Sequence, residues 1–409
     1  MQKFDVLIVG AGLNGLVTAL ALGGLKCRNP VRVGIVDRIH PAQFAANTHD
    51  SRASALTAAT QTMMGVLGVW ERLLPFAQNM NDIVVTDSKS TEHRPNLLSF
   101  STSDKSQAPA ALIENAQIFK TLLEEIGRSP SIEIMAPQNI SGFHFGPGLA
   151  SITVESGKTI KANLIVGADG RSSPTRLAAG IGFEGWDYPQ SAITLTVGHE
   201  LPHRGRAEEH FSATGVFAIL PLMGNRSSIV WTEPHETAKQ ICALTDEGFL
   251  AALSEKFGSH LGKLSLLSPH HAYPLSMYLA KTFVGTRVAL LGDAAHVVHP
   301  LAGLGLNLGF KDAAALAESI MKAANLGQDI GGTEVLQSYM QWRRFDTLAT
   351  AGLLDAMNRL FANDDVALRM LRDMGLRAAD SLPPFKNILI REAAGQVGRL
   401  PRLMRGLAA

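Results

Sequence analysis

Three separated groups of small residues beside carboxylates hold the residues best suited to chemistry in this 409-residue chain. The first is Gly10-Ala-Gly-Leu-Asn-Gly15, the second is Gly167-Ala-Asp-Gly170, and the third opens with Gly292-Asp293. Glycines let a backbone approach a phosphate closely, and carboxylates accept hydrogen bonds from sugar hydroxyls. Groups that recur along most of the chain in this way predict one extended ligand that is held along its length.

The first group has the flanking sequence of a dinucleotide-binding turn. Residues 4–9 form a short apolar run, which is typical of a strand buried on both faces. Gly10 permits the tight turn, Gly12 lets the backbone approach a pyrophosphate, and Gly15 lets the next helix pack close to the strand. The Leu- and Ala-rich residues 16–25 predict that helix, whose N-terminal amides would receive the phosphates.

A second predicted strand, residues 31–36, ends on Asp37 and Arg38. An acid about 20 residues after the glycine motif suits the ribose hydroxyls of an adenosine. Strand, helix, second strand and acid together predict a dinucleotide site that includes Asp37 and Arg38.

Two later predicted strands end in the same manner. Residues 162–167 lead into Asp169, and residues 286–291 lead into Asp293. A carboxylate at the C-terminal end of such a strand lies in the crevice where open α/β sheets bind ligands. An NAD-dependent dehydrogenase needs only the first group, whereas Asp293 suits a long polyhydroxyl arm. The ribityl chain of FAD is such an arm, so the sequence favours FAD.

With these motifs the chain resembles the class A flavoprotein monooxygenases, and among them the ubiquinone-biosynthesis hydroxylase family, nearly end to end. The matching segments are the glycine motif, Asp50-Ser-Arg52, Asp169-Gly170 with Ser173 and Arg176, Gly292-Asp293, and its extension His-Pro-x-Ala-Gly-x-Gly-x-Asn-x-Gly-x-x-Asp at residues 299–312. The extension is the most specific of them. The resemblance implies a para-hydroxybenzoate hydroxylase-like α/β fold: a Rossmann-like FAD-binding domain, an interleaved β-sheet substrate domain and a helical C-terminal tail.

The resemblance also implies roles for individual residues. Asp293 would bind the ribityl hydroxyls, and Arg52 and Gln117 would lie near the flavin and its phosphates. Asp169 would serve the dinucleotide part of FAD and the access of NAD(P)H. The remaining cofactor contacts and the lining of the flavin edge would come from Pro300, Gly303, Leu304, Gly305, Leu306 and Asn307.

Position 304 departs from the family pattern, which usually has Gln between the two glycines. Leu304 leaves the backbone donors in place but removes a side-chain hydrogen bond near the flavin. Residues 306–324 predict a helix that starts at this point, and its first amides would stabilise a negative charge by about 0.3–2 kcal/mol. Reduced flavin carries that charge on its N1–C2 carbonyl edge.

The family's reaction implies hydroxylation of an aromatic ring. NAD(P)H reduces FAD, the reduced flavin adds O₂ at C4a, and the hydroperoxide passes an oxygen to an electron-rich phenol. The implied substrate is a polyprenylated phenol of ubiquinone biosynthesis, with other proteins of that pathway and the membrane surface as partners. Two alternatives stay open: a monooxygenase for a soluble aromatic compound, and a flavin-binding scaffold of a biosynthetic complex that does not turn over.

Composition restricts the class and the location of the protein. With 37 Lys and Arg against 36 Asp and Glu, the charge argues against a nucleic-acid binder. Cys27 and Cys242 have neither metal spacing nor a disulfide framework, and His296 and His299 lack a third ligand, so we expect a reducing compartment and no metal.

The chain enters a strand directly, so no signal peptide is expected. The glycine motif also argues against a membrane-spanning helix over residues 6–25. We therefore expect a cytoplasmic protein, peripheral on the inner face of the membrane. The mean hydropathy of +0.11 is high for a cytosolic enzyme and fits a lipophilic substrate.

The order of the motifs predicts interleaved domains. We expect an FAD-binding domain from residues 1–80, 108–185 and 276–350, a substrate-domain sheet from 81–107 and 186–275, and a C-terminal helical region over 351–409. The substrate sheet is predicted from strand-like residues 82–86, 97–100, 193–197, 215–220 and 227–231. Val216, Ala218 and Leu220 alternate with Phe217 and Ile219, so both faces are apolar and one could wall a pocket over the flavin.

The end of the chain is basic. Between residues 386 and 409, five cations face one acid, and apolar residues lie between them: Lys386, Arg391, Arg399, Arg402 and Arg405 against Glu392. This pattern fits an interfacial or partner-binding helix, and it fits equally well a solvated helix that packs one face on the body.

Overall fold

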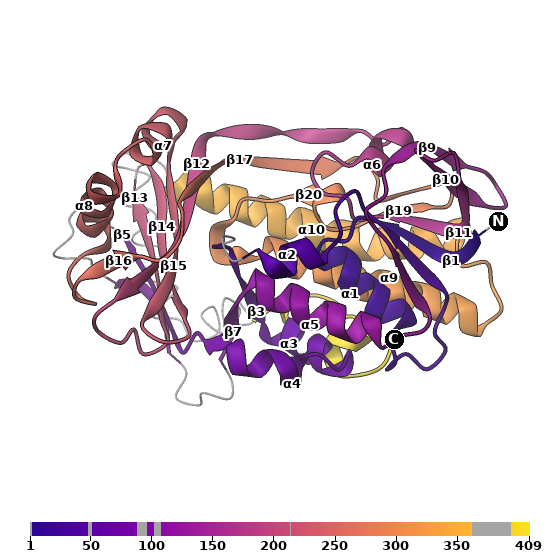
Figure 1. The fold of residues 1–409 in the computed structure, drawn as a ribbon, viewed down its shortest axis with the longest axis horizontal. Helices are drawn as coiled ribbons and strands as arrows, with labels where there is room; N and C mark the ends of the chain where they lie inside the picture. The colour runs from indigo at the N-terminus through magenta and orange to yellow at the C-terminus, as the bar shows by residue number, and fades with distance from the viewer. Residues whose placement is uncertain (1, 48–50, 88–95, 102–107, 213, 362–393) are drawn as a thin grey trace.

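The computed structural model describes residues 2–47, 51–87, 96–101, 108–212, 214–361 and 394–409. Two large sheets lie toward opposite ends of an elongated molecule, and helices fill the region between them and cover the sheet that holds the N-terminus (Figure 1). This arrangement confirms the predicted α/β class with a second, separate sheet.

The first sheet is mainly parallel and carries the three motifs. Its strands run in the order β18 (Val284–Gly285), β19 (Val288–Leu290), β11 (Thr159–Gly167), β1 (Gln2–Val9), β2 (Val33–Val36) and β8 (Ile132–Met135), with β10 (Ala150–Val154) and β9 (Ile140–Phe145) added beside β11. The four strands predicted at residues 4–9, 31–36, 162–167 and 286–291 are all present and adjacent. Because β1, β2, β11 and β19 are parallel, their C-terminal ends meet at one edge of the sheet.

Two helices follow the motifs closely. Helix α1 (Leu13–Gly23) packs on α9 (Gly305–Asn325) and α5 (Asn115–Gly127). The predicted helix at 306–324 matches α9 within one residue at each end. Helix α1 begins three residues before the predicted position 16, because Gly12 in extended conformation already serves as its N-cap.

The second sheet is mainly antiparallel. Its order is β20 (His296–Val297), β17 (His271–Ala280), β12 (Phe183–His199), β15 (Arg226–Pro234), β14 (Gly215–Leu222), β13 (Arg206–Ser212), β5 (Asp82–Asp87) and β6 (Asn96–Ser101), with β16 (Leu264–Leu266) beside β12. Every strand predicted for the substrate sheet is found here. The long strands β12 and β17 run between the two ends of the molecule (Figure 1).

One face of this sheet is covered by helices and the other is turned toward the cofactor domain. Helices α7 (His235–Cys242) and α8 (Asp246–Phe257) pack on Phe217, Ile219 and Trp231. Because side chains alternate along a strand, Val216 and Ala218 point away from these helices. A small sheet of β3 (Ala53–Thr57), β7 (Ala110–Glu114) and β4 (Gln78–Asn79) lies between the two large ones. Of the short helices, α3 (Ala58–Val66) lies beside β3, α2 (Ala42–Ala46) and α4 (Trp70–Leu73) lie beside α5, and α6 (Pro174–Ala178) lies beside β11 of the first sheet.

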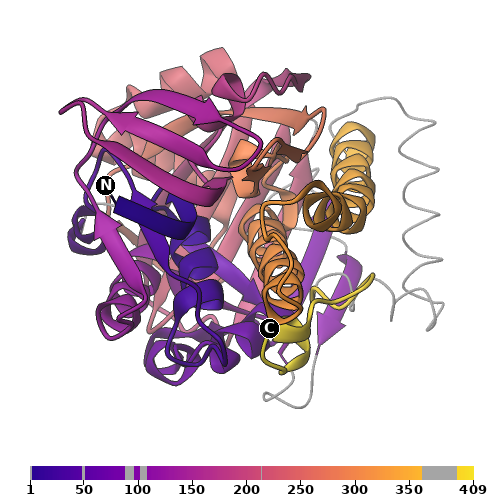
Figure 2. The ribbon, with the colours of Figure 1, turned by 90° about the vertical axis from the view of Figure 1, so that its right-hand side faces the viewer.

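The C-terminal part differs in detail from a continuous helical tail. Helix α10 (Thr333–Phe361) packs against α9, whereas residues 394–409 contain only the short 3-10 turn η5 (Arg402–Arg405). Leu403 and Met404 of that turn are buried in the core, and the segment lies beside α9 (Figure 2). Arg399, Arg402 and Arg405 therefore lie on a segment packed on the body, while Lys386, Arg391 and Glu392 lie outside the described residues. Within the described ranges, no helix is both long enough and apolar enough to cross a bilayer.

Candidate active site

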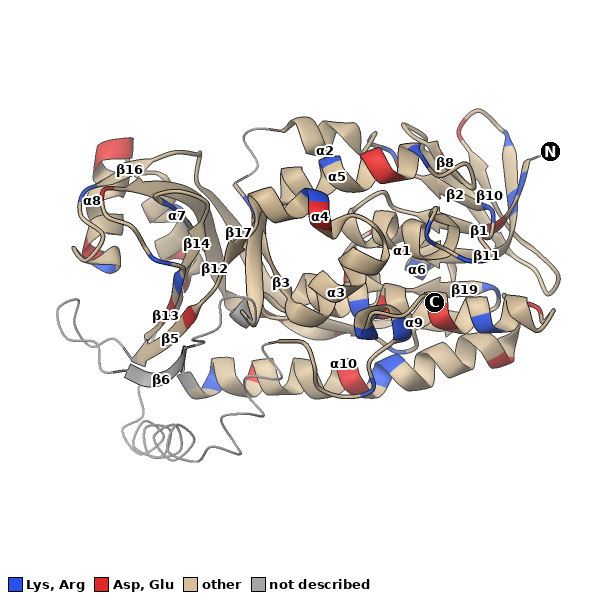
Figure 3. Cartoon of the chain, turned by 90° about the horizontal axis from the view of Figure 1, so that it is seen from below, with Lys and Arg blue, Asp and Glu red and all other residues tan. Residues whose placement is uncertain are grey.

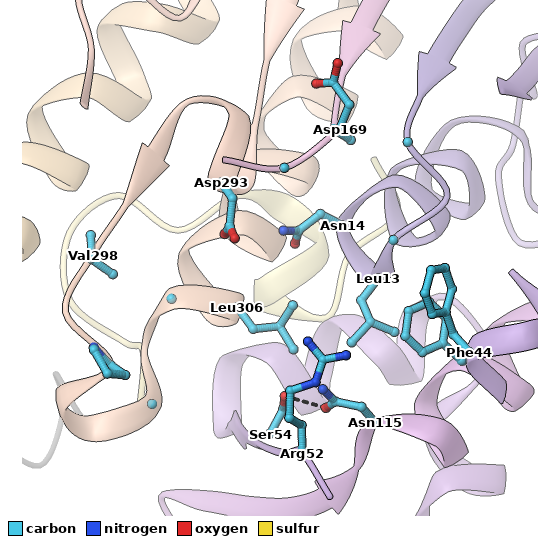
Figure 4. A pocket seen from close by; sticks show the side chains of 18 of the residues that line it. Leu13, Asn14, Phe44, Arg52, Ser54, Asn115, Asp169, Asp293, Val298 and Leu306 are labelled. Atoms are coloured by element: carbon cyan, nitrogen blue, oxygen red, sulfur yellow. Dashed lines mark hydrogen bonds between the residues drawn. The ribbon is translucent and has the colours of Figure 1, made fainter. Parts of the chain in front are cut away.

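A large cavity of about 1120 Å³ begins at the C-terminal edge of the parallel sheet and reaches the second sheet. It exceeds the roughly 300–1,000 Å³ of ordinary small-molecule sites. Of the predicted site residues, it is lined by Gly10, Gly12, Asp37, Arg38, Arg52, Asp169, Asp293, Pro300, Gly303, Gly305 and Leu306. One cavity therefore brings together residues from all three sequence motifs (Figure 4).

The glycine motif has the geometry that a bound pyrophosphate needs. Gly10 has φ of +109°, and a Cβ on it would lie 2.3 Å from the carbonyl oxygen of Ala168. A Cβ on Gly15 would lie 2.0 Å from the carbonyl oxygen of Gly10, so the helix packs this closely on the turn only because residue 15 has no side chain. At Gly12 a Cβ would meet no atom within 4 Å, which leaves open space before the first turn of α1. No side chain caps that turn, so its amides remain available to an anion.

Asp37 holds the end of β2 against this turn. Its Oδ2 accepts a hydrogen bond from the Ala11 amide at 2.6 Å, and its Oδ1 accepts one from the Ile39 amide at 2.9 Å. Each carboxylate oxygen keeps a second lone pair for a ribose hydroxyl. The rings of Phe44 and Phe119, stacked at 5.1 Å, line the cavity beside it and give an apolar surface for a flat base.

Asp293 lies deeper in the same cavity, at the end of β19. Its side chain is open to the cavity, but the surrounding protein raises the pKa of its carboxyl by desolvation, and the charges of His296 and Arg52 only partly oppose this. Figure 4 shows Asp293 and Asn14 pointing toward one another, with Arg52 on the far side of Leu306. Asn14 was not predicted, although an amide inside an otherwise apolar glycine turn was a signal for it.

The Asp-Gly motif lines the cavity and also connects segments of the chain. The Asp169 carboxylate accepts hydrogen bonds from the Ser173 hydroxyl and from the Thr175 amide at 2.9 Å, and so caps α6. Arg176 is buried, and its guanidinium donates to the carbonyl oxygen of Ala294 at 3.0 Å. The second motif is thus bonded directly to the third, beside Asp293.

The third motif supplies a helix N-terminus to the cavity. Gly305 and Leu306 of the first turn of α9 line the cavity, together with Pro300 and Gly303 before it, and no side chain caps the helix. Its first amides can therefore stabilise negative charge in the cavity. We expect the flavin edge beside this turn.

Three predicted contacts lie elsewhere. The Asn307 amide is bonded to the carbonyl oxygen of Ala55 at 2.7 Å and accepts from the Thr57 amide at 3.0 Å, so it ties α9 to β3 and does not line the cavity. Leu304 packs in an apolar cluster with Phe211 and Val216. Neither residue is among those that line the cavity, so the contacts of Leu304 and Asn307 with the cofactor stay predictions.

Gln117 is likewise not among the cavity-lining residues. Asn115 takes the place on the wall, and it accepts a hydrogen bond from the Ser54 hydroxyl at 2.7 Å (Figure 4). Successive helical residues are rotated by about 100°, so a side chain two positions further along α5 points away from the cavity.

A buried charge network supports the Gly-Asp motif from behind. Asp312 accepts hydrogen bonds from Arg343 Nε at 2.7 Å and from the Gly292 amide at 3.1 Å, and His296 Nε2 lies 2.5 Å from it. Burial opposes ionisation, but the charges of His296 and Arg343 hold the pKa of Asp312 below its usual range. His296 is therefore engaged with a carboxylate, and no group of three metal-binding side chains occurs in the part of the chain that the structure describes.

The second sheet forms the far wall of the cavity. Val216, Ala218, Leu220 and Val230 line it with apolar side chains, as predicted for one face of this sheet, and Glu209 and Thr232 add polar groups. His299 also lines the cavity; its Nδ1 accepts from the Leu301 amide at 3.3 Å, so the neutral ring carries its proton on Nε2. Burial lowers the pKa of His299 to about 4, so the ring is uncharged near neutral pH.

Comparison with known proteins gives this geometry a family. A model described as an FAD binding domain matches residues 3–349. The chain is 39% identical over 406 residues to a ubiquinone hydroxylase, UbiL, of Rhodospirillum rubrum, an alignment that covers 98% of this chain and 93% of the relative. It is 30% identical over 396 residues to the 3-demethoxyubiquinol 3-hydroxylase of Escherichia coli, covering 96% of this chain and 99% of that one.

Solved structures share the fold at lower sequence identity. The p-nitrophenol 4-monooxygenase PnpA of Pseudomonas putida has a TM-score of 0.80 at 20% identity, over 98% of this chain and 100% of that one. PqsL of Pseudomonas aeruginosa in complex with 2-aminobenzoylacetate has a TM-score of 0.75 at 22% identity, over 92% of this chain and 99% of that one. With its three motifs around one cavity, the chain belongs to the FAD-binding monooxygenase family that includes the ubiquinone hydroxylases.

Proposed function

We propose that this protein is an FAD-dependent monooxygenase that uses NAD(P)H and O₂ to hydroxylate the aromatic ring of a polyprenylated phenol in ubiquinone biosynthesis. One observation carries the proposal: the crevice with the three cofactor motifs and the apolar wall of the second sheet belong to the same cavity. The names of the relatives from Rhodospirillum rubrum and Escherichia coli agree with this substrate class.

The residues present fit FAD. The open space before α1 suits the pyrophosphate, Asp37 suits the adenosine ribose, and Asp293 suits the ribityl hydroxyls. Arg52 supplies a positive charge near the flavin end, and the first amides of α9 face the same region. When bound there, FAD supplies the redox and oxygen chemistry, and the protein supplies binding, orientation and electrostatics.

The sheet wall suits the ring of the substrate. Val216, Ala218 and Leu220 exclude water from one side of the cavity, and a dry site strengthens each electrostatic interaction within it. Thr232 and Glu209 are the polar groups on this wall, so we assign them to the oxygen substituents of the ring. Pro300 and Gly303, from the other side, limit how the ring can lie above the cofactor.

A lipophilic substrate also bears on location. A polyprenylated phenol resides in a bilayer, so we propose that the protein works as a peripheral protein at the inner face of the membrane, in contact with other proteins of ubiquinone biosynthesis.

Deletion of the gene, followed by mass analysis of quinone intermediates, tests the proposal. We expect less ubiquinone and a prenylated intermediate that lacks one ring oxygen, with rescue by the wild-type gene and not by an Asp293→Ala variant that has lost FAD. A normal quinone pool would indicate a soluble aromatic substrate instead. Rescue by a variant shown to be free of FAD would indicate a scaffold that does not turn over.

A further inference from the structure

Helix α10 has apolar residues on both its inner and its outer face. Its inner face packs on residues at the cavity: Leu354 clusters with Val216 and Leu301, and Ala351 clusters with Val298 and Met277. Val216, Leu301 and Val298 are themselves lining residues of the cavity. The C-terminal half of α10 therefore forms the layer that separates this part of the cavity from the outside of the protein.

The outer face of the same stretch is exposed. We define it by the large residues Phe345, Leu348, Leu353 and Leu360, of which Phe345 is 76% and Leu353 44% exposed. The smaller exposed residues Ala349, Gly352 and Ala356 lie between them. The spacings of three and four residues place all of these on one side of the helix. A contiguous apolar strip of this kind indicates a contact surface.

The charged side chains along this stretch either turn away from the apolar strip or lie at its two ends. Asp346 is turned to Arg343 and Lys311, and Asp355 is turned to Tyr188 and Arg359, so both carboxylates are largely covered. Figure 3 shows α10 mostly tan between these charged positions. Exposed Arg344 and Arg359 lie at the two ends of the strip. The Arg359 guanidinium lies 5.1 Å above the ring of Trp186, a residue type favoured at the membrane interface.

We infer that the outer face of α10 is the surface by which this protein lies on an anionic bilayer leaflet, and that a lipophilic substrate enters the cavity at this helix. The inference rests on the proposed function. An amphipathic helix with an apolar strip and flanking arginines lies in the plane of the interface, with its strip among the acyl chains and its cations at the anionic headgroups. The outer face of α10 would then lie on the bilayer, while its inner face packs on Val216 and Val298 at the cavity.

This surface differs from the basic C-terminal segment. Leu403 and Met404 are buried in the core, and the Arg402 amide donates to Glu318 at 2.7 Å, so residues 402–405 are committed to the body of the protein. Arg399 lies over the ring of Trp342 at 4.5 Å, on the first half of α10. These arginines can add attraction at long range, but the apolar contact comes from α10.

Vesicle flotation of the full-length, FAD-loaded protein tests the inference. The vesicles contain phosphatidylglycerol and phosphatidylcholine, and the test variant is Phe345→Ser/Leu348→Ser/Leu353→Ser. The matched control is Leu25→Ser/Leu177→Ser/Leu326→Ser, which removes exposed leucines from other elements; Leu177 is 68% and Leu326 64% exposed. We expect the test variant to bind vesicles at least about tenfold more weakly and the control to bind like wild type. Arg344→Gln should weaken binding at low salt and have little effect at high salt.

Two further measurements separate the alternatives. The melting temperature and oligomeric state of the test variant should equal those of wild type, and its oxidation of a short-tailed, water-soluble phenol should be unchanged. Unchanged vesicle binding would overturn the inference. A large fall in melting temperature would show that the chain itself covers this strip, and dissociation of an oligomer would show that a second copy does; either result would also overturn it. If wild-type protein oxidises the soluble phenol but ignores vesicles, only this inference fails, whereas a protein that oxidises no phenol contradicts the proposed function.

Discussion

Arg343 donates a hydrogen bond through Nε to the Asp312 carboxylate at 2.7 Å, and neither side chain is exposed to solvent. The pair joins α9 to α10. The other carboxylate oxygen of Asp312 holds the Gly292 amide and His296, on either side of Asp293. The last residue of the long sequence motif therefore positions the carboxylate that we assign to the ribityl chain, without itself lining the cavity.

Asp312→Asn should destabilise the protein strongly. Removing one partner of a buried ion pair leaves an uncompensated charge and costs about 3–5 kcal/mol. The matched control is Glu184→Gln, which breaks a 2.7 Å ion pair with Lys281 whose side chains are both largely exposed. Denaturant unfolding should show a change of less than about 1 kcal/mol for the control. Equal changes in the two variants would contradict the structural role of the network.

The effect of Asp312→Asn on the free energy of unfolding should depend on pH. The pKa of Asp312 in the folded protein is lowered, so its ionised form stabilises the fold above the unfolded pKa of about 4, and this contribution is lost as the pH falls below that value. The difference in unfolding free energy between wild type and Asp312→Asn should therefore be constant near neutral pH and shrink in acid. A difference that grows on acidification would show that the sign is wrong.

Asp293→Ala should lose most of its FAD. A hydrogen bond to a charged acceptor contributes about 1.5–3 kcal/mol, so loss of even one should weaken FAD binding about 10- to 150-fold. The raised pKa of Asp293 also predicts a pH dependence. As the pH is lowered, the FAD affinity of the wild type should begin to fall at a higher pH than it would with an ordinary carboxylate. Titration of the apoprotein by flavin fluorescence measures both effects, with Asp293→Asn as the variant that keeps the shape. Full FAD occupancy in Asp293→Ala would remove this residue from the cofactor site.

Asn14 should be coupled energetically to Gly309. A Cβ on Gly309 would lie 2.4 Å from Asn14 Oδ1, and a Cβ on Gly292 would lie 2.3 Å from Asn14 Nδ2, so the amide is held between two glycines. Gly309→Ala should cost about 1–3 kcal/mol by overpacking. The double variant Asn14→Ala/Gly309→Ala should recover most of that loss, since the three nearest atoms to the added methyl all belong to Asn14. Additive losses in thermal unfolding would contradict this contact.

Leu304→Gln should lower stability and still bind FAD. Leu304 lies against an apolar cluster that includes Phe211, Val216 and Leu354, where an amide without a partner costs about 1–3 kcal/mol. The backbone amides of the first turn of α9 are unaffected, so flavin absorbance per protein should stay near wild type. Leu304→Met, which preserves the apolar volume, serves as the control. An unchanged melting temperature with faster turnover would show that position 304 acts on the flavin.

Much of the fold was predictable because its signals are local. The runs that form β1, β2, β11 and β19 are mainly apolar, as buried parallel strands require. The alternation in β14 predicted two apolar faces, one of which could wall a pocket, and the structure places Val216, Ala218 and Leu220 on the cavity side. Gly10 and Asp37 were identified because their spacing reflects the local strand–turn–helix geometry.

The contacts that escaped prediction depend on the rotation of helices and on residues far apart in the chain. Gln117 and Asn115 are separated by two positions of one helix, and only the packing of α5 determines which of them faces the cavity. Asn307 bonds to Ala55 across 252 positions, and Asp312 to Arg343 across 31, so neither partner is visible in the local sequence. Motif residues of this kind tie segments together, and their spacing alone does not distinguish that role from ligand binding.

The most direct test of the central claim is the origin of the oxygen in the product. Purified protein with FAD is supplied with NADH or NADPH, isotope-labelled oxygen gas and a short-chain prenylated phenol, and the product is analysed by mass spectrometry. We predict one labelled oxygen atom on the aromatic ring for each molecule of product, with no product from Asp293→Ala. Consumption of NAD(P)H by FAD-loaded wild-type protein without any labelled oxygen on the ring would contradict the assignment as a hydroxylase of this substrate class.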